Sequence, residues 1–301
     1  MGVTTSIQLR PFSVNSTEWQ ERCYGGEKIM DHPEYYFPDG NIILIVDNTA
    51  FNLYRGILQR HSALFEDINE SALIIYGNMK AETFAILYQF LFPKEIGVLP
   101  AVHAGQTQQW DPVIRGTNDL FIPGIRVYIV KKLAEDKTIV AAKAIDFLAW
   151  IQDRDKELED LLLECIRIVV YRRSPLTHKE AVGLSGSRAN LVAVARERIR
   201  SLFYNPNYWK AQIPNTLCRA PSRHCSDGVF LAMAKQMSIS TKPINPGPGP
   251  ATEPDLLQIA VDSMCALCSR KYAESVKQNI DLEIKKCLAE EVEASEFCQM
   301  A

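Results

Sequence analysis

The residues of this 301-residue chain whose spacing comes closest to a known chemistry are cysteines. Cys218 and Cys225 lie seven residues apart with His224 beside the second, and Cys265 and Cys268 form a C-x-x-C pair. Four thiolates are a ligand set that zinc binds in tetrahedral structural sites. These four cysteines are therefore the candidate ligands of a zinc-binding regulatory domain.

Three features weigh against that zinc site. The first pair lacks the short spacing of most zinc motifs, the C-x-x-C pair falls in a stretch with helical periodicity, and a Pro/Gly-rich segment separates the two pairs. In a reducing compartment, free thiols are the simpler interpretation of all eight cysteines, several of them packed as small hydrophobic side chains. We therefore expect no cofactor and no metal, and the zinc site is the alternative.

The sequence offers little for catalysis. The segment from Gly183 to Ser187 approaches the G-x-S-x-G pattern of a nucleophilic serine, but it ends in serine and lies between two predicted helices. A helix end at Gly183 or Gly186 and a new N-cap at Ser187 explain it better. Phosphate-binding loops, dinucleotide fingerprints and H-E-x-x-H motifs are absent from the sequence. We expect no catalytic residues and no enzyme.

Composition narrows the class of protein further. Lys and Arg total 33 against 36 Asp and Glu, giving a net charge of −3, and 47% of residues are hydrophobic. Nucleic-acid binding needs a surplus of basic residues, which this chain lacks. Its N-terminus carries no secretory signal pattern, and its apolar runs are too short to span a bilayer. The sequence predicts a cytoplasmic or nuclear protein that binds neither nucleic acid nor membrane.

The N-terminal half predicts a small sheet with helices. Residues 41–46 and 49–54 read as two strands of a hairpin separated by Asp47 and Asn48. Apolar residues at spacings of three and four predict a helix over 57–68, followed by a strand over 71–76 and a helix over 81–92 that stops at Pro93.

The rest of the chain reads as helical, with two interruptions. Residues 94–112 predict an irregular insertion, and the Pro/Gly-rich residues 239–254 predict a linker. Between them the periodicity predicts helices over 113–120, 125–133, 138–151, 155–171 and 188–204. A long C-terminal helix is expected from residue 255. It carries an apolar stripe that we expect to dock on the protein's own helical part: Leu256, Leu257, Val261, Met264 and Leu267.

The run from His32 to Ile68 resembles the BTB/POZ domain, especially the BTB proteins abundant in mushroom-forming fungi. Two positions depart from the family pattern, with Asn41 and Tyr54 standing where an Asp and a His are usual. Residues 174–184 and 191–203 are similar to the helical extension of the fungal proteins. The signature positions, which the resemblance implies are core and dimer-face residues, are Phe51, Leu53, Ile57, Leu58, Ser62 and Phe65.

The resemblance implies an α+β fold, a small BTB/POZ-like sheet flanked by helices and followed by an all-helical extension. It also implies a non-enzymatic protein-interaction module that forms a homodimer and recruits protein partners. Some family members recruit substrates to cullin-type ubiquitin-ligase scaffolds and others act in transcription, and no residue here chooses between these roles. The expected parts are a partly disordered N-terminal segment (1–29), a BTB/POZ-like domain (30–135), a helical extension (136–238), a linker (239–254) and a C-terminal helix with a frayed tail (255–301).

Overall fold

The computed structural model divides the chain into two compact units, Met1–Glu135 and Asp136–Ala301. The division falls at the residue where the sequence places the end of the BTB-like part. Among the residues described, no helix is long and apolar enough to cross a membrane. The structure describes residues 8–11, 23–24, 27–68, 72–76, 79–95, 97–171, 175–213, 218, 224–239, 262–270, 278–279, 281–287 and 289–290.

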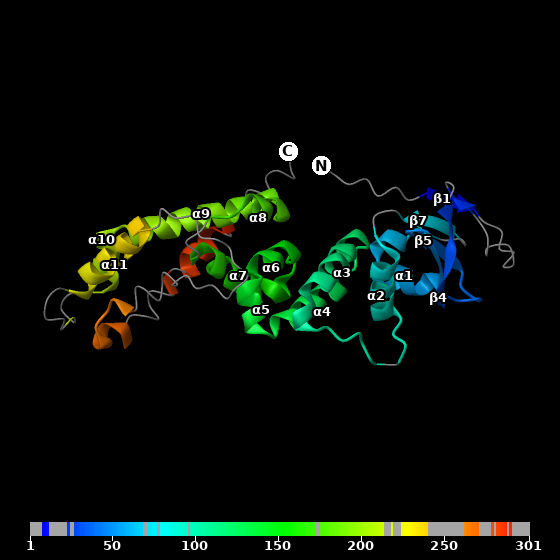
Figure 1. Cartoon of the computed structure of the whole chain (residues 1–301), viewed down its shortest axis with the longest axis horizontal. Coiled ribbons are helices and arrows are strands. Elements are labelled where there is room, and N and C mark those ends of the chain that lie inside the picture. The colour runs from blue at the N-terminus through cyan, green and yellow to red at the C-terminus, as the bar shows by residue number, and fades with distance from the viewer. Residues whose placement is uncertain are drawn as a thin grey trace. The chain divides into compact units, whose positions relative to one another are not determined.

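The first unit contains a mixed five-stranded sheet, so the predicted α+β class is correct at this level (Figure 1). Its strands, in spatial order, are β1 (Gln8–Pro11), β7 (Ala72–Tyr76), β5 (Ile42–Val46), β6 (Thr49–Leu53) and β4 (Met30–Tyr36). The central β5 pairs antiparallel with β6 and parallel with β7. Two further short strands, β2 (Cys23–Tyr24) and β3 (Glu27–Lys28), pair with each other within the segment predicted for residues 1–29.

The predicted hairpin is confirmed, and its turn explains its register. Asp47 and Asn48 both have positive φ, at 46° and 60°, which is the backbone of a two-residue type I′ turn. This turn matches the right-handed twist of the strands, and it pairs Val46 with Thr49 and Ile42 with Leu53. The edge strands β1 and β4 contain Pro11 and Pro33, which lack the amide needed to extend the sheet further.

The core of the first unit covers β5 on both faces, and every residue of this strand is buried. On one face, Phe51 of β6 makes an edge contact with Phe84 of α2 (Ala81–Leu91), with 4.8 Å between ring centroids. On the other face, Ile43 and Ile45 join a smaller buried cluster that includes Ile29 and Ala50. A strand buried on both faces reads as a continuous apolar run, as this one does.

The helix predicted over 57–68 is broken into two pieces. Helix α1 spans Arg55–His61, Ser62 has extended backbone angles, and a single 3₁₀ turn covers Ala63–Phe65. The Ser62 hydroxyl donates to the backbone carbonyl of Leu120. This bond across 58 residues of sequence explains why the helix stops here although the apolar periodicity continues.

The insertion predicted over 94–112 is shorter than expected. A 3₁₀ turn at Ala104–Gln106 leads into helix α3 (Thr107–Asp119), which contains Pro112 within its first two turns. Trp110 on this helix is buried and makes an edge contact with Phe90 of α2. Helix α4 (Pro123–Ala134) packs against α3 and completes the unit.

The second unit is all helical in its described residues. In the core, α7 packs against α6 and α9, and α10 packs against α11. The buried Trp150 and Trp209 anchor α6 and α10. The helices are α5 (Lys137–Ala142), α6 (Ala144–Trp150), α7 (Glu159–Tyr171), α8 (His178–Gly183), α9 (Gly186–Phe203), α10 (Pro206–Gln212) and α11 (Cys225–Ile239).

Caps account for several helix ends in this unit. Thr177 and Glu180 form the predicted capping box at the start of α8. The side chain of Asp136 accepts from the backbone N–H of Thr138 and caps α5. The single helix predicted over 138–151 is interrupted at Lys143, whose ψ of 25° leaves the helical region.

The predicted C-terminal helix is discontinuous where the structure describes it. Residue 262 is helical, 263–265 form a turn and an irregular residue, and helical residues resume over 266–270 and 281–287. Residues 255–261, which carry Leu256, Leu257 and Val261 of the predicted stripe, lie outside the described residues, as do 240–254 of the predicted linker. Of the stripe's described members, Leu267 is 47% exposed.

Among the described residues, positions beyond the stripe hold the C-terminal segment against the helical unit. Ile284 and Cys287 are buried, and Arg167 of α7 forms an ion pair with Asp281 at 2.7 Å. Arg198 of α9 pairs with Glu290. Docking therefore combines a small apolar contact with charged pairs, beside α7 and α9 (Figure 1).

We expect Phe65→Ala to lower the free energy of unfolding by about 3 to 5 kcal/mol, because Phe65 is fully buried and its removal leaves a cavity. Urea unfolding followed by circular dichroism measures this change. The exposed neighbour Glu66 provides a control, since Glu66→Ala should stay within about 0.5 kcal/mol of the wild type. A loss below about 1 kcal/mol for Phe65→Ala would contradict the buried position.

The cap at Asp136 predicts a pH-dependent stability. Hydrogen bonds from the Thr138 side chain and backbone lower the pKa of the Asp136 carboxyl in the folded protein. Its contribution is therefore complete above the unfolded-state pKa and is lost as the pH falls through the lower, folded-state pKa. Asp136→Ala should reduce the melting temperature at pH 7, and the difference from wild type should shrink toward pH 3. Asp136→Asn should keep an N-cap acceptor and lose this pH dependence, and an equal effect of the alanine change at both pH values would contradict the assignment.

Candidate functional site

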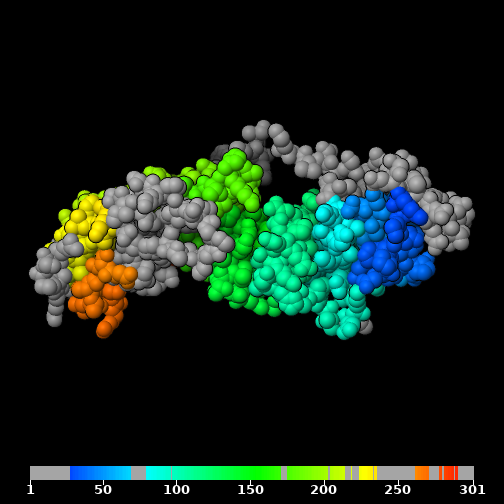
Figure 2. Space-filling model, in the orientation of Figure 1, coloured from blue at the N-terminus to red at the C-terminus, as the bar shows by residue number. Residues whose placement is uncertain are grey.

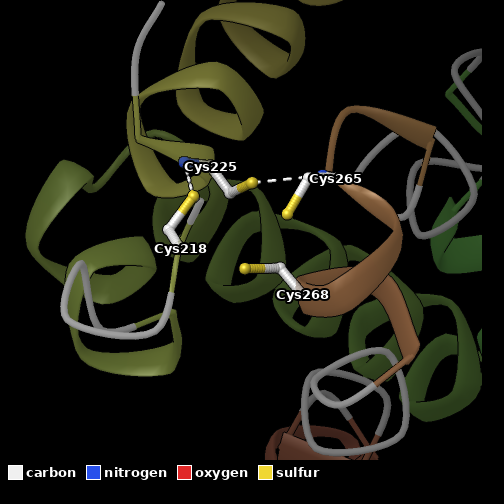
Figure 3. A group of neighbouring side chains, drawn as sticks. All are labelled: Cys218, Cys225, Cys265 and Cys268. Atoms are coloured by element: carbon white, nitrogen blue, oxygen red, sulfur yellow. Dashed lines mark hydrogen bonds between the residues drawn. The ribbon is translucent and has the colours of Figure 1, made fainter. Parts of the chain in front are cut away.

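Four cysteines converge in the second unit. The sulfur atoms of Cys218, Cys225, Cys265 and Cys268 all lie within 4.8 Å of one another. Figure 3 shows the four side chains turned toward a common centre, one pair from the ribbon around the start of α11 and the other from residues 262–270. Cys225 and Cys268 are buried, and Cys218 and Cys265 are half-buried.

In each pair, a cysteine at the start of a helical stretch fixes the position of the sulfur atoms. Cys225 is the first residue of α11, and its backbone N–H, which has no partner within the helix, donates to the Cys218 sulfur at 3.2 Å. Cys265 directly precedes the helical residues 266–270, and Cys268 lies in their first turn. The Cys265 N–H donates to the Cys225 sulfur at 3.1 Å and thereby links the two pairs.

Hydrogen bonds lower the pKa of one of these thiols, whereas burial raises the pKa of two others. The backbone N–H of Cys268 donates to the Cys265 sulfur and, with the N–H of Leu267 and the neighbouring thiols, lowers the pKa of Cys265 to about 6. Burial raises the pKa of Cys225 to about 11 and also raises that of Cys268. Hydrogen bonding therefore favours the thiolate form of Cys265, and burial favours the protonated forms of Cys225 and Cys268. A bound cation would favour the deprotonated form of each.

The structure overturns two of the sequence-based objections to a metal site. The C-x-x-C pair does not lie inside a continuous helix, since the backbone turns at residues 263–265 and only Cys268 is helical. The separation of the pairs in sequence does not keep them apart, because residues 262–270 lie against α11 (Figure 2). The four thiols therefore lie together in the folded chain.

The remaining described cysteines and His224 are not part of this group. Cys165 on α7 and Cys287 are buried, and their sulfurs lie outside the group. His224 precedes Cys225 but is exposed and contributes no atom to the group. Cys298 lies outside the described residues.

The signature positions of the first unit are mostly interior. Five of the six are buried in the core, so they cannot themselves contact another molecule: Phe51, Leu53, Leu58, Ser62 and Phe65. The sixth, Ile57, is half-buried on α1. Of the predicted set, Ile57 is thus the side chain that is accessible to a partner.

Sequence analysis did not bring together Phe37, Tyr54 and Phe92, which we define as the aromatic patch; Tyr54 directly precedes α1. Phe37 stacks on Tyr54 with 4.9 Å between centroids, and Phe92 meets Phe37 at 5.4 Å. The Tyr54 hydroxyl donates to Asp39 at 2.9 Å, which raises the pKa of Tyr54. Phe92 is 36% exposed. No periodic signal marks this patch, because its members come from three separate segments.

Potential catalytic groups find structural roles. The Ser185 side chain accepts from the backbone N–H of Arg188 and caps α9, so the N-cap is Ser185 and not the predicted Ser187. Among the described residues, an open groove of about 490 Å³ lies between α7 and the C-terminal segment. Among the charged residues that line it, Arg167 and Asp281 form an ion pair, and no cysteine, serine or histidine is among the lining residues.

The chain matches no family model, and no curated protein matches it either. Function is therefore inferred from the residues and their geometry. The two features available are the partly exposed aromatic patch of the first unit and the cysteine group of the second.

Burial makes a clear prediction for thiol reactivity. Cys165 is completely buried, which raises its pKa to about 12, so little thiolate exists at pH 8 and no reagent can reach it. We expect iodoacetamide to leave Cys165 unmodified in the folded protein and to alkylate it after unfolding in urea. Peptide mass spectrometry reads both states, and rapid labelling of folded protein at Cys165 would contradict this packing.

Proposed function

We propose that the chain is a non-enzymatic protein-interaction module of the BTB/POZ type, acting in the cytoplasm or nucleus by self-association and partner recruitment. The observation that carries the proposal is the order and pairing of elements in the first unit. An antiparallel β5–β6 hairpin leads into α1, then into β7 beside β5, and then into α2 against the sheet. This is the succession that the resemblance of residues 32–68 leads us to expect.

Contacts of Tyr54 and Asn41, the two residues that differ from the usual family pattern, support the proposal. Tyr54 reaches Asp39, and the Asn41 side chain accepts from the backbone N–H of Arg55 at 2.7 Å. The loop before the hairpin is thus tied to the start of α1 by a different pair of residues from those usual in the family. The hairpin and the helix keep a defined relation without the usual Asp and His.

The surface proposed for the second copy is formed by Ile57 and the aromatic patch. The N–H of Ile57 donates to the Tyr54 carbonyl, which keeps α1 next to the patch. Aromatic side chains are enriched at the centres of interfaces because they bury a large area at a small entropic cost. Symmetric pairing is the commonest way for a chain to cover such a surface.

A dimer would present each partner-binding surface twice, which raises the avidity for partners that are themselves assembled. Recruitment to a cullin-type ligase scaffold and assembly of transcription-related complexes are the two uses that the resemblance implies. In both uses, the first unit would join two copies of the chain. The helical unit is then free to hold other proteins.

Self-association is tested by sedimentation of the full-length protein. We expect a dimer at tens of micromolar, an order of magnitude typical of working interfaces. Ile57→Asp places a charge on the proposed surface and should weaken the dimer by about tenfold or more, because a buried unpaired charge costs at least about 1.4 kcal/mol.

The matched control is Val182→Asp, which makes the same kind of change at a 69%-exposed position of α8 and should leave the dimer unchanged. Circular dichroism of each variant checks that the fold is kept. A wild-type protein that stays monomeric at these concentrations would refute self-association, and an Ile57→Asp variant that is folded and fully dimeric would place the interface elsewhere.

A further inference from the structure

We propose that Cys218, Cys225, Cys265 and Cys268 bind one zinc ion in a closed, four-thiolate structural site that fastens residues 262–270 to the start of α11. The proposal stands on the convergence of the four sulfur atoms within 4.8 Å. It is independent of the proposed assembly of the first unit, because every ligand belongs to the second.

The spacing of the sulfurs fits a single ion. With metal–sulfur bonds of about 2.3 Å, the sulfurs of a tetrahedral site lie about 3.8 Å from one another. Sulfurs within 4.8 Å reach this arrangement by side-chain adjustments of an ångström or less. An iron–sulfur cluster distributes its cysteines over several irons and so spreads the sulfurs further apart. The group is therefore compact enough for a mononuclear site.

The surroundings of the sulfurs suit the charge of a four-thiolate zinc site, which is 2 − 4 = −2. The N–H groups of Cys225 and Cys265 already donate to sulfur atoms of the group. Such outer hydrogen bonds orient ligands and disperse their negative charge, and helix N-termini favour anions.

Four thiolates leave no open position, so the site is structural rather than catalytic. Binding involves no oxidation or reduction: zinc forms four bonds to sulfur, and each thiol that carries a proton releases it to the buffer. Soft thiolate ligands in a tetrahedral arrangement favour zinc over magnesium and calcium, which prefer oxygen.

The consequence of the site is a cross-link between segments 40 residues apart, Cys225 and Cys265. Among the described residues, the other contacts of the C-terminal segment include two charged pairs, Arg167–Asp281 and Arg198–Glu290, a hydrogen bond from the Asn279 side chain to Gln212, and the buried side chains of Ile284 and Cys287. Partly exposed pairs contribute only about 0 to 1 kcal/mol each. A metal bond to four thiolates would therefore be the strongest link in this region.

Metal content of the full-length protein, purified under reducing conditions, tests the site. Inductively coupled plasma mass spectrometry should find one zinc and no iron per chain, and intact mass should show every thiol reduced. Cys218→Ser and Cys268→Ser each remove one ligand, one from each pair, and should lower zinc to about a tenth or less of the wild-type content. The matched control, Cys287→Ala, removes a buried thiol outside the group and should retain the zinc.

Cobalt substitution of the wild-type protein provides a measurement that needs no variant. Cobalt bound by four thiolates should give the intense sulfur-to-metal absorption of a tetrahedral site, and zinc should displace it. Wild-type protein without metal, with iron in place of zinc, or with disulfides among these cysteines would overturn the proposal. So would serine variants that are folded and keep their full zinc content.

The fastening role has its own test. Removal of zinc by a chelator should raise amide hydrogen exchange in residues 281–287 by about tenfold or more, while β5 in the first unit stays unchanged. Equal protection of residues 281–287 with and without the metal would refute the cross-link even if zinc binds.

Discussion

The burial of β5 on both faces is the constraint from which the first unit follows. A five-residue strand with no exposed side chain needs a cover on each side of the sheet. Helices α1 and α2 cover one face, and Ile29, Ala50 and their neighbours cover the other. The parallel partner β7 can only be reached by a crossover, and α1 with the 3₁₀ turn after it is the crossover that the chain provides. The order of elements is therefore a consequence of placing one apolar strand at the centre.

In the second unit, the described residues of the C-terminal segment bury few apolar side chains. Leu267 remains largely exposed, while Ile284 and Cys287 make only a small buried contact. The ion pairs of Asp281 and Glu290 help to fix where the segment lies, but they add little to its free energy of docking. In the proposed zinc site, coordination by the four thiols would add to these contacts, since metal binding stabilises small regions that a hydrophobic core cannot.

The two proposals assign different work to the two units. The first unit offers a surface, formed by Ile57 and the aromatic patch, on a rigid scaffold of sheet and helix. The second unit offers a cluster of sulfur atoms whose geometry suits a closed site. The two proposals therefore use different residues, and either one can be refuted while the other holds.

What the sequence by itself determined is local. The β5–β6 hairpin follows from an apolar run, two turn residues and an alternating strand, and the start of α8 follows from Thr177 and Glu180. These features depend on residues a few positions apart, whose types restrict the backbone directly. The burial of Phe51, Leu58 and Phe65 can also be predicted from the sequence. The spacing of apolar residues indicates which face of a helix or strand packs against the core.

Only the tertiary structure decided which distant residues meet. The break of α1 at Ser62 depends on a carbonyl at Leu120, and the aromatic patch joins three segments. The cysteine group shows the difference most clearly: each pair looks unremarkable in its own stretch, and the stretch around Cys265 reads as helix. The backbone turn at 263–265 and the packing against α11 bring the four sulfurs together. Long-range packing sets that convergence, whereas the sequence offered the four cysteines only as an alternative set of ligands.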